Sequence, residues 1–282
     1  MSTQSPSVAE KRRAFRELHA KGCFVIPNPW DIGSARFLQG LGFKALATTS
    51  AGFAWSRGYP DNGITRDMAL AHLREMVAAT ELPINADYEN GFASDAAGVA
   101  ESVRLAVETG IAGVSIEDST GETAQPLFDI DTAVGRIRAA RGAIDKAGGD
   151  TLLVGRAECF LVGKPDMDET LARLKAYAQA GADVLYAPGL RKREQISAAV
   201  AAVAPKPINL LVGWPSDLTL GDIAALGVRR VSVGGALART AWGGFARTAR
   251  MIAEQGRFDG FAEGAPGQEL NTFFRGDAKR RG

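Results

Sequence analysis

Two carboxylates spaced two residues apart follow a short apolar run at residues 83–86, and this group could do chemistry. They are Asp87 and Glu89, and Gly91 lies two residues further on. In a β-strand, residues i and i+2 point to the same face, so both acids are expected to face the space beyond the strand's carboxyl end. Like charges held this close raise the pKa of one acid unless a cation lies between them, and Mg2+ takes oxygen ligands of this kind. The stretch predicts a divalent-metal site or, about equally, two solvated acids where a strand ends.

The composition excludes several classes of partner. The chain has 282 residues, of which 46% are apolar and 23% charged, and its net charge is +1. Such values fit a globular domain with a substantial core and give no general attraction to nucleic acid or to an anionic membrane. No unbroken apolar stretch approaches the roughly 18 residues that a membrane span needs. We therefore expect no nucleic-acid partner and no membrane partner.

Cysteine and histidine usage narrows the chemistry further. Cys23 and Cys159 make no disulfide framework, and the first residues lack the basic and apolar regions of a signal peptide, so a cytoplasmic location is expected. The two histidines, His19 and His72, both fall in stretches of helical period. A histidine-centred triad or a multi-histidine zinc site is therefore not expected. Carboxylates, a metal, arginine and hydroxyls remain as the groups that carry the chemistry.

Eight short apolar runs of strand type alternate with stretches of helical period. The runs are residues 23–27, 45–50, 82–87, 113–118, 152–156, 184–187, 208–212 and 231–233. Several are apolar on both faces, as are strands buried on both sides of a parallel sheet. This alternation predicts a (β/α)8 barrel. A doubly wound open sheet is the alternative, but no Gly-x-Gly-x-x-Gly turn follows the first run.

Polar residues mark where the helices between these runs begin. Helix caps are predicted at Asp31, Thr65, Ser94, Asp166 and Ser216, because their side-chain oxygens can accept hydrogen bonds from the first free N–H groups. Residues 51–63, after the second run, are expected to form a long loop.

The chain divides into three parts on this interpretation. Residues 1–22 form an N-terminal helix that packs on the barrel, residues 23–255 form the barrel itself, and residues 256–282 form a C-terminal tail. The tail is expected to hold one short helix at 269–275 and a frayed end at 277–282. Two adjacent phenylalanines, Phe273 and Phe274, predict that the tail packs either on a neighbouring subunit or across the barrel's bottom.

In a barrel of this type the chemistry lies at the carboxyl ends of the strands. Acids from three consecutive strand ends then face one mouth, and without a cation they repel one another. Arg156, at the end of the fifth run, is suited to holding a carboxylate or phosphate with two hydrogen bonds, or to a salt bridge with Glu117 or Glu158. The other polar residues at or near these ends are Asp61, Asp87, Glu89, Asp118 and Asn209.

Several motifs resemble those of the isocitrate lyase/phosphoenolpyruvate mutase superfamily over roughly residues 10–255. The most specific is residues 87–92, Asp-Tyr-Glu-Asn-Gly-Phe, which is similar to the family's metal motif D-x-D-x-G-[YF]-G. Further matches are Ser-Ala-Gly at 50–52 with Asp61 after it, Ile-Glu-Asp at 116–118, and Val-Gly-Arg-Ala-Glu-Cys-Phe at 154–160. Their order and spacing agree with the family.

The resemblance implies a Mg2+-dependent barrel, with Mn2+ as an alternative metal, that acts on small 2-oxo or 2-hydroxy acids. A C–C bond of an oxaloacetate-like or methylisocitrate-like substrate is then cleaved through a metal-stabilised enolate. The resemblance also implies a homotetramer or dimer that exchanges its last helix between subunits. The resemblance implies, by position, that Asp87 is the direct metal ligand and that the metal's waters are held by Asp61, Glu89 and Glu117. The substrate carboxylate is then bound by Ser50 and by the N–H groups of Ala51 and Gly52. Arg156 binds the substrate's other oxygens. Asn209 is a further candidate for the pocket lining.

One loop departs from the family pattern and leaves the reaction open. Isocitrate lyases carry Lys-Lys-Cys-Gly-His after the fourth strand, whereas residues 117–126 contain neither cysteine nor histidine nor lysine. Glu89 also replaces an Asp of the metal motif. The local proton carriers are then Ser119, Thr120 or a metal water. The alternatives are a phosphonate P–C bond hydrolase or mutase acting on a phosphonopyruvate-like substrate, and a non-catalytic dicarboxylate binder.

Overall fold

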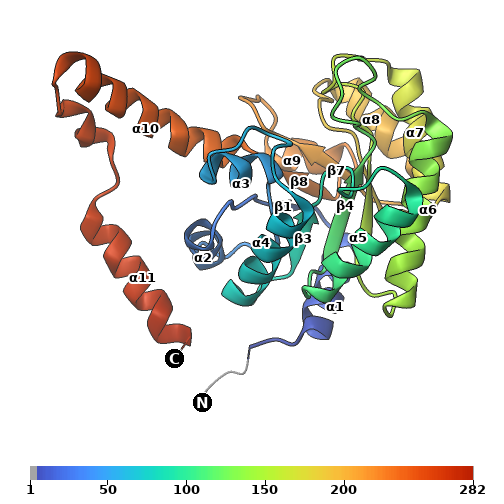
Figure 1. Ribbon diagram of the computed structural model, residues 1–282, viewed down its shortest axis with the longest axis horizontal. Coiled ribbons are helices and arrows are strands. Elements are labelled where there is room, and N and C mark those ends of the chain that lie inside the picture. The colour runs from blue at the N-terminus through green and yellow to red at the C-terminus, as the bar shows by residue number, and fades with distance from the viewer. Residues whose placement is uncertain (1–4, 282) are drawn as a thin grey trace.

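The computed structural model describes residues 5–281. Eight parallel strands form one sheet in the order β1-β8-β7-β6-β5-β4-β3-β2, and the sheet curves into a nearly closed barrel with helices around it (Figure 1). The strands are β1 Phe24–Ile26, β2 Leu46–Ala47, β3 Ile84–Asp87, β4 Gly113–Glu117, β5 Leu152–Arg156, β6 Val184–Tyr186, β7 Ile208–Leu211 and β8 Arg230–Ser232. The Ala47 N–H donates to the Pro27 carbonyl at 3.1 Å and links the two end strands. The predicted (β/α)8 barrel is confirmed, and the open-sheet alternative is wrong.

Helices follow the strands around the barrel. They are α1 Val8–Ala20, α2 Ile32–Gly40, α3 Ser50–Ser56, α4 Arg66–Ala79, α5 Ala96–Glu108, α6 Ile130–Lys146, α7 Met167–Gln179, α8 Arg193–Val203, α9 Leu220–Ala225, α10 Ala236–Gln255, the 3-10 helix η1 Asp259–Glu263 and α11 Gly267–Arg281. Among residues 5–281, no helix combines the length and apolarity needed to cross a membrane.

Three of the five predicted helix caps are confirmed and two are wrong. Asp31, Thr65 and Asp166 each accept a hydrogen bond from the third residue of their helix. For α5 the cap is Asp95, one residue after the predicted Ser94. For α9 it is Thr219, because the Ser216 hydroxyl accepts from the Leu218 N–H and forms a separate turn before the helix.

The stretch after β2 differs from the predicted loop. Residues 50–56 form helix α3, because the Thr49 side chain accepts from the Gly52 N–H and caps it. Ser50 and Ala51 therefore lie in the first turn of a helix, where backbone N–H groups point out of the helix end. This turn faces the carboxyl-terminal mouth of the barrel.

The opposite end of the barrel is closed by α1. Phe15 of α1 is fully buried and packs with Ile26, Ala45, Ala112 and Leu152, which come from or flank four strands. Apolar contact at this end leaves the carboxyl-terminal mouth as the open end of the barrel interior.

The C-terminal segment departs from the barrel and returns. α10 points away from the barrel body, and α11 comes back beside α2 (Figure 1). Arg36 Nε donates to Asp277 Oδ2 at 2.8 Å, and the Phe37 and Phe273 rings lie 4.8 Å apart. The expected fraying is wrong for residues 277–281, because Asp277 is only 1% exposed and is held by the buried Arg36. The expected short helix is longer, and Gly282 lies outside the described residues.

Candidate active site

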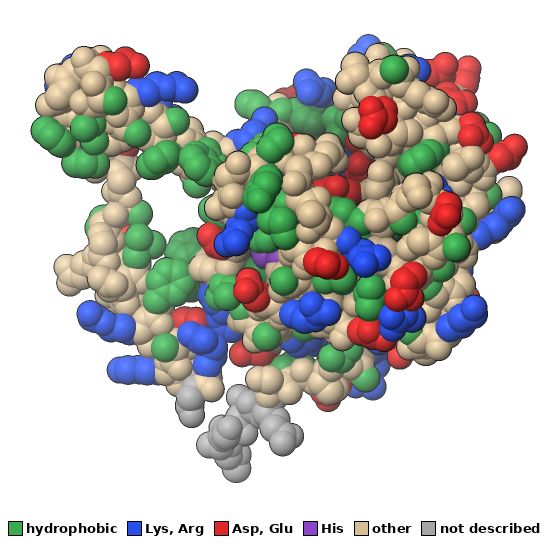
Figure 2. All heavy atoms as spheres, in the orientation of Figure 1, with side chains coloured by type: hydrophobic (Ala, Val, Ile, Leu, Met, Phe, Trp, Pro, Cys, Tyr) green, Lys and Arg blue, Asp and Glu red, His purple; other side chains and the backbone are tan. Residues whose placement is uncertain are grey.

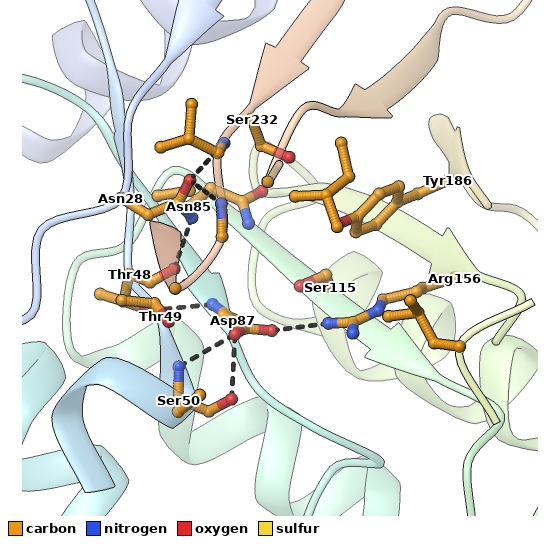
Figure 3. Close-up of a pocket in the computed structure, with 18 of the residues that line it drawn as sticks. Asn28, Thr48, Thr49, Ser50, Asn85, Asp87, Ser115, Arg156, Tyr186 and Ser232 are labelled. Carbon is orange, nitrogen blue, oxygen red and sulfur yellow. Dashed lines mark hydrogen bonds and ion pairs between the residues drawn. The ribbon is translucent and has the colours of Figure 1, made fainter. Parts of the chain in front are cut away.

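A cavity of about 390 Å³ lies at the carboxyl ends of the strands. Its lining combines strand residues with the first turn of α3 and the loop that carries Asp61. Figure 3 shows Asp87 near its centre, between Ser50 on one side and Arg156 on the other. A mouth built this way places donors from several strands around one small ligand.

Asp87 connects two elements that are far apart in the sequence. Its Oδ2 accepts from the Ser50 N–H at 2.9 Å and from the Ser50 hydroxyl at 3.0 Å. Its Oδ1 accepts from Arg156 Nη1 at 3.0 Å, and its own N–H donates to the Thr48 hydroxyl at 2.9 Å. The carboxylate is thus fixed by the start of α3 and by the end of β5.

Arg156 is surrounded by acids. Its Nη1 lies 3.0 Å from Asp87 and 3.1 Å from Glu117, and its Nε donates to Glu158. The guanidinium carbon lies 5.2 Å from the centre of the Tyr186 ring. Burial raises the pKa of both Glu117 and Glu158, although the Arg156 charge opposes this. The salt bridges expected from the sequence are therefore present, and they fix the orientation of the arginine.

Glu89 lies beyond the strand, so the argument from strand alternation is wrong for it. β3 ends at Asp87, and Glu89 has a left-handed backbone with a φ of 47° in a turn that also contains Gly91. Burial, followed by the charges of Asp87 and Asp61, raises the pKa of Glu89 to about 8. Its Oε1 is buried without a hydrogen-bond partner. Burial and Asp87 also raise the pKa of Asp61.

The acids grouped around Arg156 carry more negative charge than this one guanidinium can balance. Three carboxylates, those of Asp87, Glu117 and Glu158, form salt bridges with Arg156. The carboxylates of Asp61 and Glu89 are close enough to interact with Asp87 and Arg156 electrostatically. An orphaned carboxylate oxygen and raised carboxyl pKa values are expected at a site where a bound divalent cation would balance the charge. Within residues 5–281, no three His, Cys, Asp or Glu side chains converge as ready-made metal ligands. A cation held directly by Asp87 and otherwise through water fits both observations.

The predicted carboxylate-binding turn is only partly free. Ser50 and Ala51 line the cavity, but both Ser50 donors are used by Asp87. The Gly52 N–H donates to the Thr49 hydroxyl at 3.2 Å and serves the helix cap. A Cβ on Gly52 would lie 2.7 Å from the Thr49 Cγ2, so the close packing of this turn needs glycine.

The other predicted residues lie around the cavity or outside it. Asn209 is buried on β7 and does not line the cavity, but it accepts from Arg230 Nε at 2.7 Å. Ser119 and Thr120 lie on the loop after β4 and do not line the cavity either. The Thr120 hydroxyl donates to the Gln125 carbonyl at 2.5 Å, and the Ser119 hydroxyl accepts from the Gly121 N–H at 3.3 Å. Both hydroxyls stabilise the loop's own turn.

Sequence reasoning missed the polar residues that lie inside the strands. These are Asn85, Ser115, Tyr186, Arg230 and Ser232, all of which line the cavity. The available signal was alternation, because Asn85 lies two residues before Asp87 and Ser115 two before Glu117. For the eighth strand the apolar run was placed at 231–233, one residue late, so Arg230 was left outside it.

Barrel enzymes of the (β/α)8 type carry their active sites at the carboxyl-terminal mouth, and in this chain that mouth holds buried acids around an arginine. The model of the family described as phosphoenolpyruvate phosphomutase matches residues 15–253. The chain belongs to this family, as its motifs predicted.

Relatives within the superfamily include enzymes that act on oxaloacetate. The chain is 31% identical to an oxaloacetate decarboxylase of Paraburkholderia xenovorans LB400, and the match covers 79% of this chain and 74% of that protein. It is 48% identical to a crystal structure from Burkholderia cenocepacia J2315, provisionally named a lyase/mutase, with a TM-score of 0.91 over 95% and 97% of the two chains. An oxaloacetate acetylhydrolase solved with its product oxalate has 27% identity and a TM-score of 0.82 over 95% of each chain.

The family match and the similar proteins together establish the general class of activity. The chain is a carbon–carbon lyase-type enzyme of the isocitrate lyase/phosphoenolpyruvate mutase superfamily. The alternative of a non-catalytic dicarboxylate binder is therefore not favoured.

Proposed function

We propose that this enzyme cleaves a C–C bond of a small 2-oxo or 2-hydroxy carboxylic acid of the oxaloacetate type, with Mg2+ as cofactor. The observation that carries the proposal is Asp87, which lines the cavity between Ser50 of α3 and Arg156 of β5. Glu117 and Glu158 pair with the same arginine. The relatives named for oxaloacetate chemistry support the choice of substrate class. The cavity volume of about 390 Å³ suits a ligand of this size.

The metal is assigned to Asp87, with Asp61, Glu89 and Glu117 positioned to hold its waters. When bound, Mg2+ or Mn2+ supplies a Lewis acid that stabilises negative charge on the reacting substrate. The excess of buried carboxylate charge and the orphaned Oε1 of Glu89 support this assignment.

The chain's own residues bind and orient the substrate. The Ala51 N–H, at the start of α3, orients the substrate carboxylate, while the Ser50 hydroxyl and N–H hold Asp87 in place. Arg156 is immobilised by Glu117 and Glu158 and directs its remaining donors toward substrate oxygens. Burial raises the pKa of Tyr186 to about 12, so this cavity-lining phenol is neutral at neutral pH and can donate a hydrogen bond to a substrate oxygen. Ser119 and Thr120 remain predicted proton carriers.

The first experiment is product analysis by NMR on oxaloacetate and on methylisocitrate with Mg2+. Decarboxylation of oxaloacetate gives pyruvate, whereas hydrolysis gives oxalate and acetate. The Asp87→Ala variant is the control, and an enzyme-free sample measures spontaneous decarboxylation. Cleavage by the native chain above both controls is the expected result. Equal rates in the native chain and the variant would contradict the proposal.

Phosphonate chemistry is the second candidate, because the family description names a phosphomutase. Phosphonopyruvate in the same assay, followed by phosphorus NMR, distinguishes it. Release of phosphate or a new phosphate ester, without C–C cleavage of the carboxylic acids, would favour the second candidate.

We also infer a homo-oligomer, a tetramer or a dimer, that exchanges the C-terminal helices. In α10 only Ala238 is buried, although the helix has 20 residues. Figure 2 shows patches of apolar side chains on the projecting arm, whose exposed residues include Trp242, Phe245, Phe258 and Phe261. Apolar surface of this kind is usually covered by a partner. Light scattering after gel filtration should give a mass above 29.7 kDa, and Phe245→Glu should lower it.

A further inference from the structure

Arg230 is a buried charge at the deep end of the active-site cavity. It is the first residue of β8, is 2% exposed and lines the cavity. Its Nε donates to Asn209 Oδ1 at 2.7 Å, and its Nη1 lies 3.4 Å from Asn85 Oδ1. Both acceptors are neutral amides. Among residues 5–281, Arg230 forms no salt bridge with a carboxylate, and neither of its two hydrogen bonds uses Nη2.

The neighbouring titratable groups do not supply the missing charge. Burial, and then the Arg230 charge itself, lowers the pKa of His19 to about 3, so His19 is neutral at neutral pH. Tyr186, with a pKa raised by burial to about 12, is neutral as well. Burial lowers the pKa of Arg230 to about 10, so the guanidinium keeps its charge at neutral pH. Arg230 is therefore an uncompensated cation, which is costly in a protein interior.

The other buried arginines of residues 5–281 show what a structural arginine looks like here. Arg36 is paired with Asp277, and Arg173 with Asp118. Arg136 has no carboxylate partner and its Nε is unpaired, but its two terminal nitrogens donate to three backbone carbonyls at 2.6 to 3.2 Å. All three lie outside the cavity, whereas Arg230, which lines it, has only the two amide contacts. An anionic ligand in the cavity is the partner that this position lacks.

We propose that Arg230 binds the distal carboxylate of a dicarboxylic substrate whose reacting end is held by Ala51 and Arg156. This inference rests on the proposed function and specifies it, because it makes Arg230 the residue that selects dicarboxylates over monocarboxylates. Both ends belong to the same cavity, since Ala51 and Arg230 line it together. Asn209 and Asn85 hold two of the guanidinium nitrogens and leave Nη2 to the ligand.

The amide contact with Asn85 depends on a glycine in the neighbouring strand. Asn85 pairs with Gly113 in the sheet, and a Cβ at position 113 would lie 2.6 Å from Asn85 Oδ1. Gly113 thus provides the space that Asn85 needs in order to orient the arginine.

The test measures the affinity of two matched ligands by calorimetry in Mg2+. Malate and lactate are both 2-hydroxy acids and differ only in the distal carboxylate. The native chain should bind malate more tightly than lactate. Arg230→Met should weaken malate binding by about 10- to 100-fold, the value of one charge-assisted hydrogen bond, and leave lactate binding unchanged. Arg230→Lys, which keeps the charge, should retain part of the preference.

Arg136→Met is the matched control, because it also removes a buried arginine but lies away from the cavity. It should lower the melting temperature and leave the ratio of malate to lactate affinity unchanged. Equal affinities in the native chain would overturn the proposal without any variant. The proposal would also be overturned if the preference for malate survived in Arg230→Met but was lost in Arg239→Met, which replaces another arginine of the cavity lining.

Two further outcomes separate the possible failures. If oxalate, malate and lactate all fail to bind in Mg2+, the proposed function itself fails. If chloride alone raises the melting temperature of the native chain but not of Arg230→Met, and malate is not preferred, then Arg230 holds an inorganic anion and the dicarboxylate proposal is wrong.

Discussion

Adjacent residues of the fourth strand end, Glu117 and Asp118, belong to two buried charge clusters that differ in their balance. The Asp118 cluster lies behind the barrel wall: its Oδ1 accepts from the Glu158 N–H at 2.8 Å, and its Oδ2 accepts from Arg173 at 2.9 Å and from the Tyr177 hydroxyl at 2.5 Å. The Glu117 cluster lies at the mouth around Arg156, where Glu89 keeps a buried oxygen without a partner.

Glu117 and Asp118 belong to different clusters because successive side chains of an extended chain point to opposite faces of the sheet. Every oxygen of the Asp118 carboxylate is satisfied within the protein, and such a cluster contributes to stability and position. The mouth cluster holds several carboxylates against one arginine, which is unfavourable unless a ligand adds positive charge. The difference distinguishes a satisfied ion cluster from the cluster to which we assign ligand binding, and both lie at the end of the same strand.

Replacing Asp87 should give the largest effect on activity. Asp87→Ala removes the acceptor shared by Ser50 and Arg156, and turnover should fall by at least about 10²- to 10³-fold, as when one preorganised electrostatic group is lost from an active site. Steady-state kinetics on the cleaved substrate gives the measurement. The melting temperature should stay near that of the native chain, and a variant with nearly native turnover would remove Asp87 from the mechanism.

Replacing Asp118 should instead affect stability. Asp118→Ala leaves the buried Arg173 without its carboxylate, and the free energy of unfolding should fall by about 3–5 kcal/mol. Each kcal/mol lowers the melting temperature of a chain this size by about 2–4 °C. Urea denaturation measures the change, and the exposed Asp217→Ala serves as the control, with an effect within about 0.5 kcal/mol. A native denaturation midpoint for Asp118→Ala would mean that the two clusters do not differ in this way.

The pH dependence of stability in EDTA should sharpen the comparison. Glu89 has a folded pKa of about 8, above its unfolded value of 4.5, so the folded state binds more protons between these values. Stability from this group is then lost as pH rises from 4.5 through 8, with a slope of at most about 1.4 kcal/mol per pH unit. Glu89→Gln should flatten the slope between pH 6.5 and 8, and the histidine contribution is the same in both chains. An identical slope in both chains would show that Glu89 is not strained by burial.

Changes on the loop after β4 should have the smallest effect if its hydroxyls only shape the turn. Ser119 and Thr120 lie outside the cavity, and their hydroxyls bond within the loop. We therefore expect Ser119→Ala and Thr120→Ala to change turnover little. A proton carrier would behave differently, since removing one typically costs about 10²- to 10⁴-fold. Rates for both variants decide between these roles.

Sequence patterns predicted the parts of the site that lie at strand ends. Asp87, Arg156 and Glu117 could be found because acids and arginine after apolar runs mark the carboxyl ends of a barrel. Arg230 could not, since a charged residue inside a strand does not match an apolar pattern. Neither could Asp277, because its burial depends on Arg36, 241 residues away in the sequence.

Thermal unfolding with oxalate, in Mg2+ and separately in EDTA, tests the central claim that the mouth cluster is a metal-dependent carboxylate site. Ligand that binds only the folded state raises its stability by mass action, by about 2.7 kcal/mol at 100 times the dissociation constant. We predict a rise in melting temperature with oxalate in Mg2+ and none in EDTA. A rise of equal size in EDTA, or no rise in either buffer, would contradict the account.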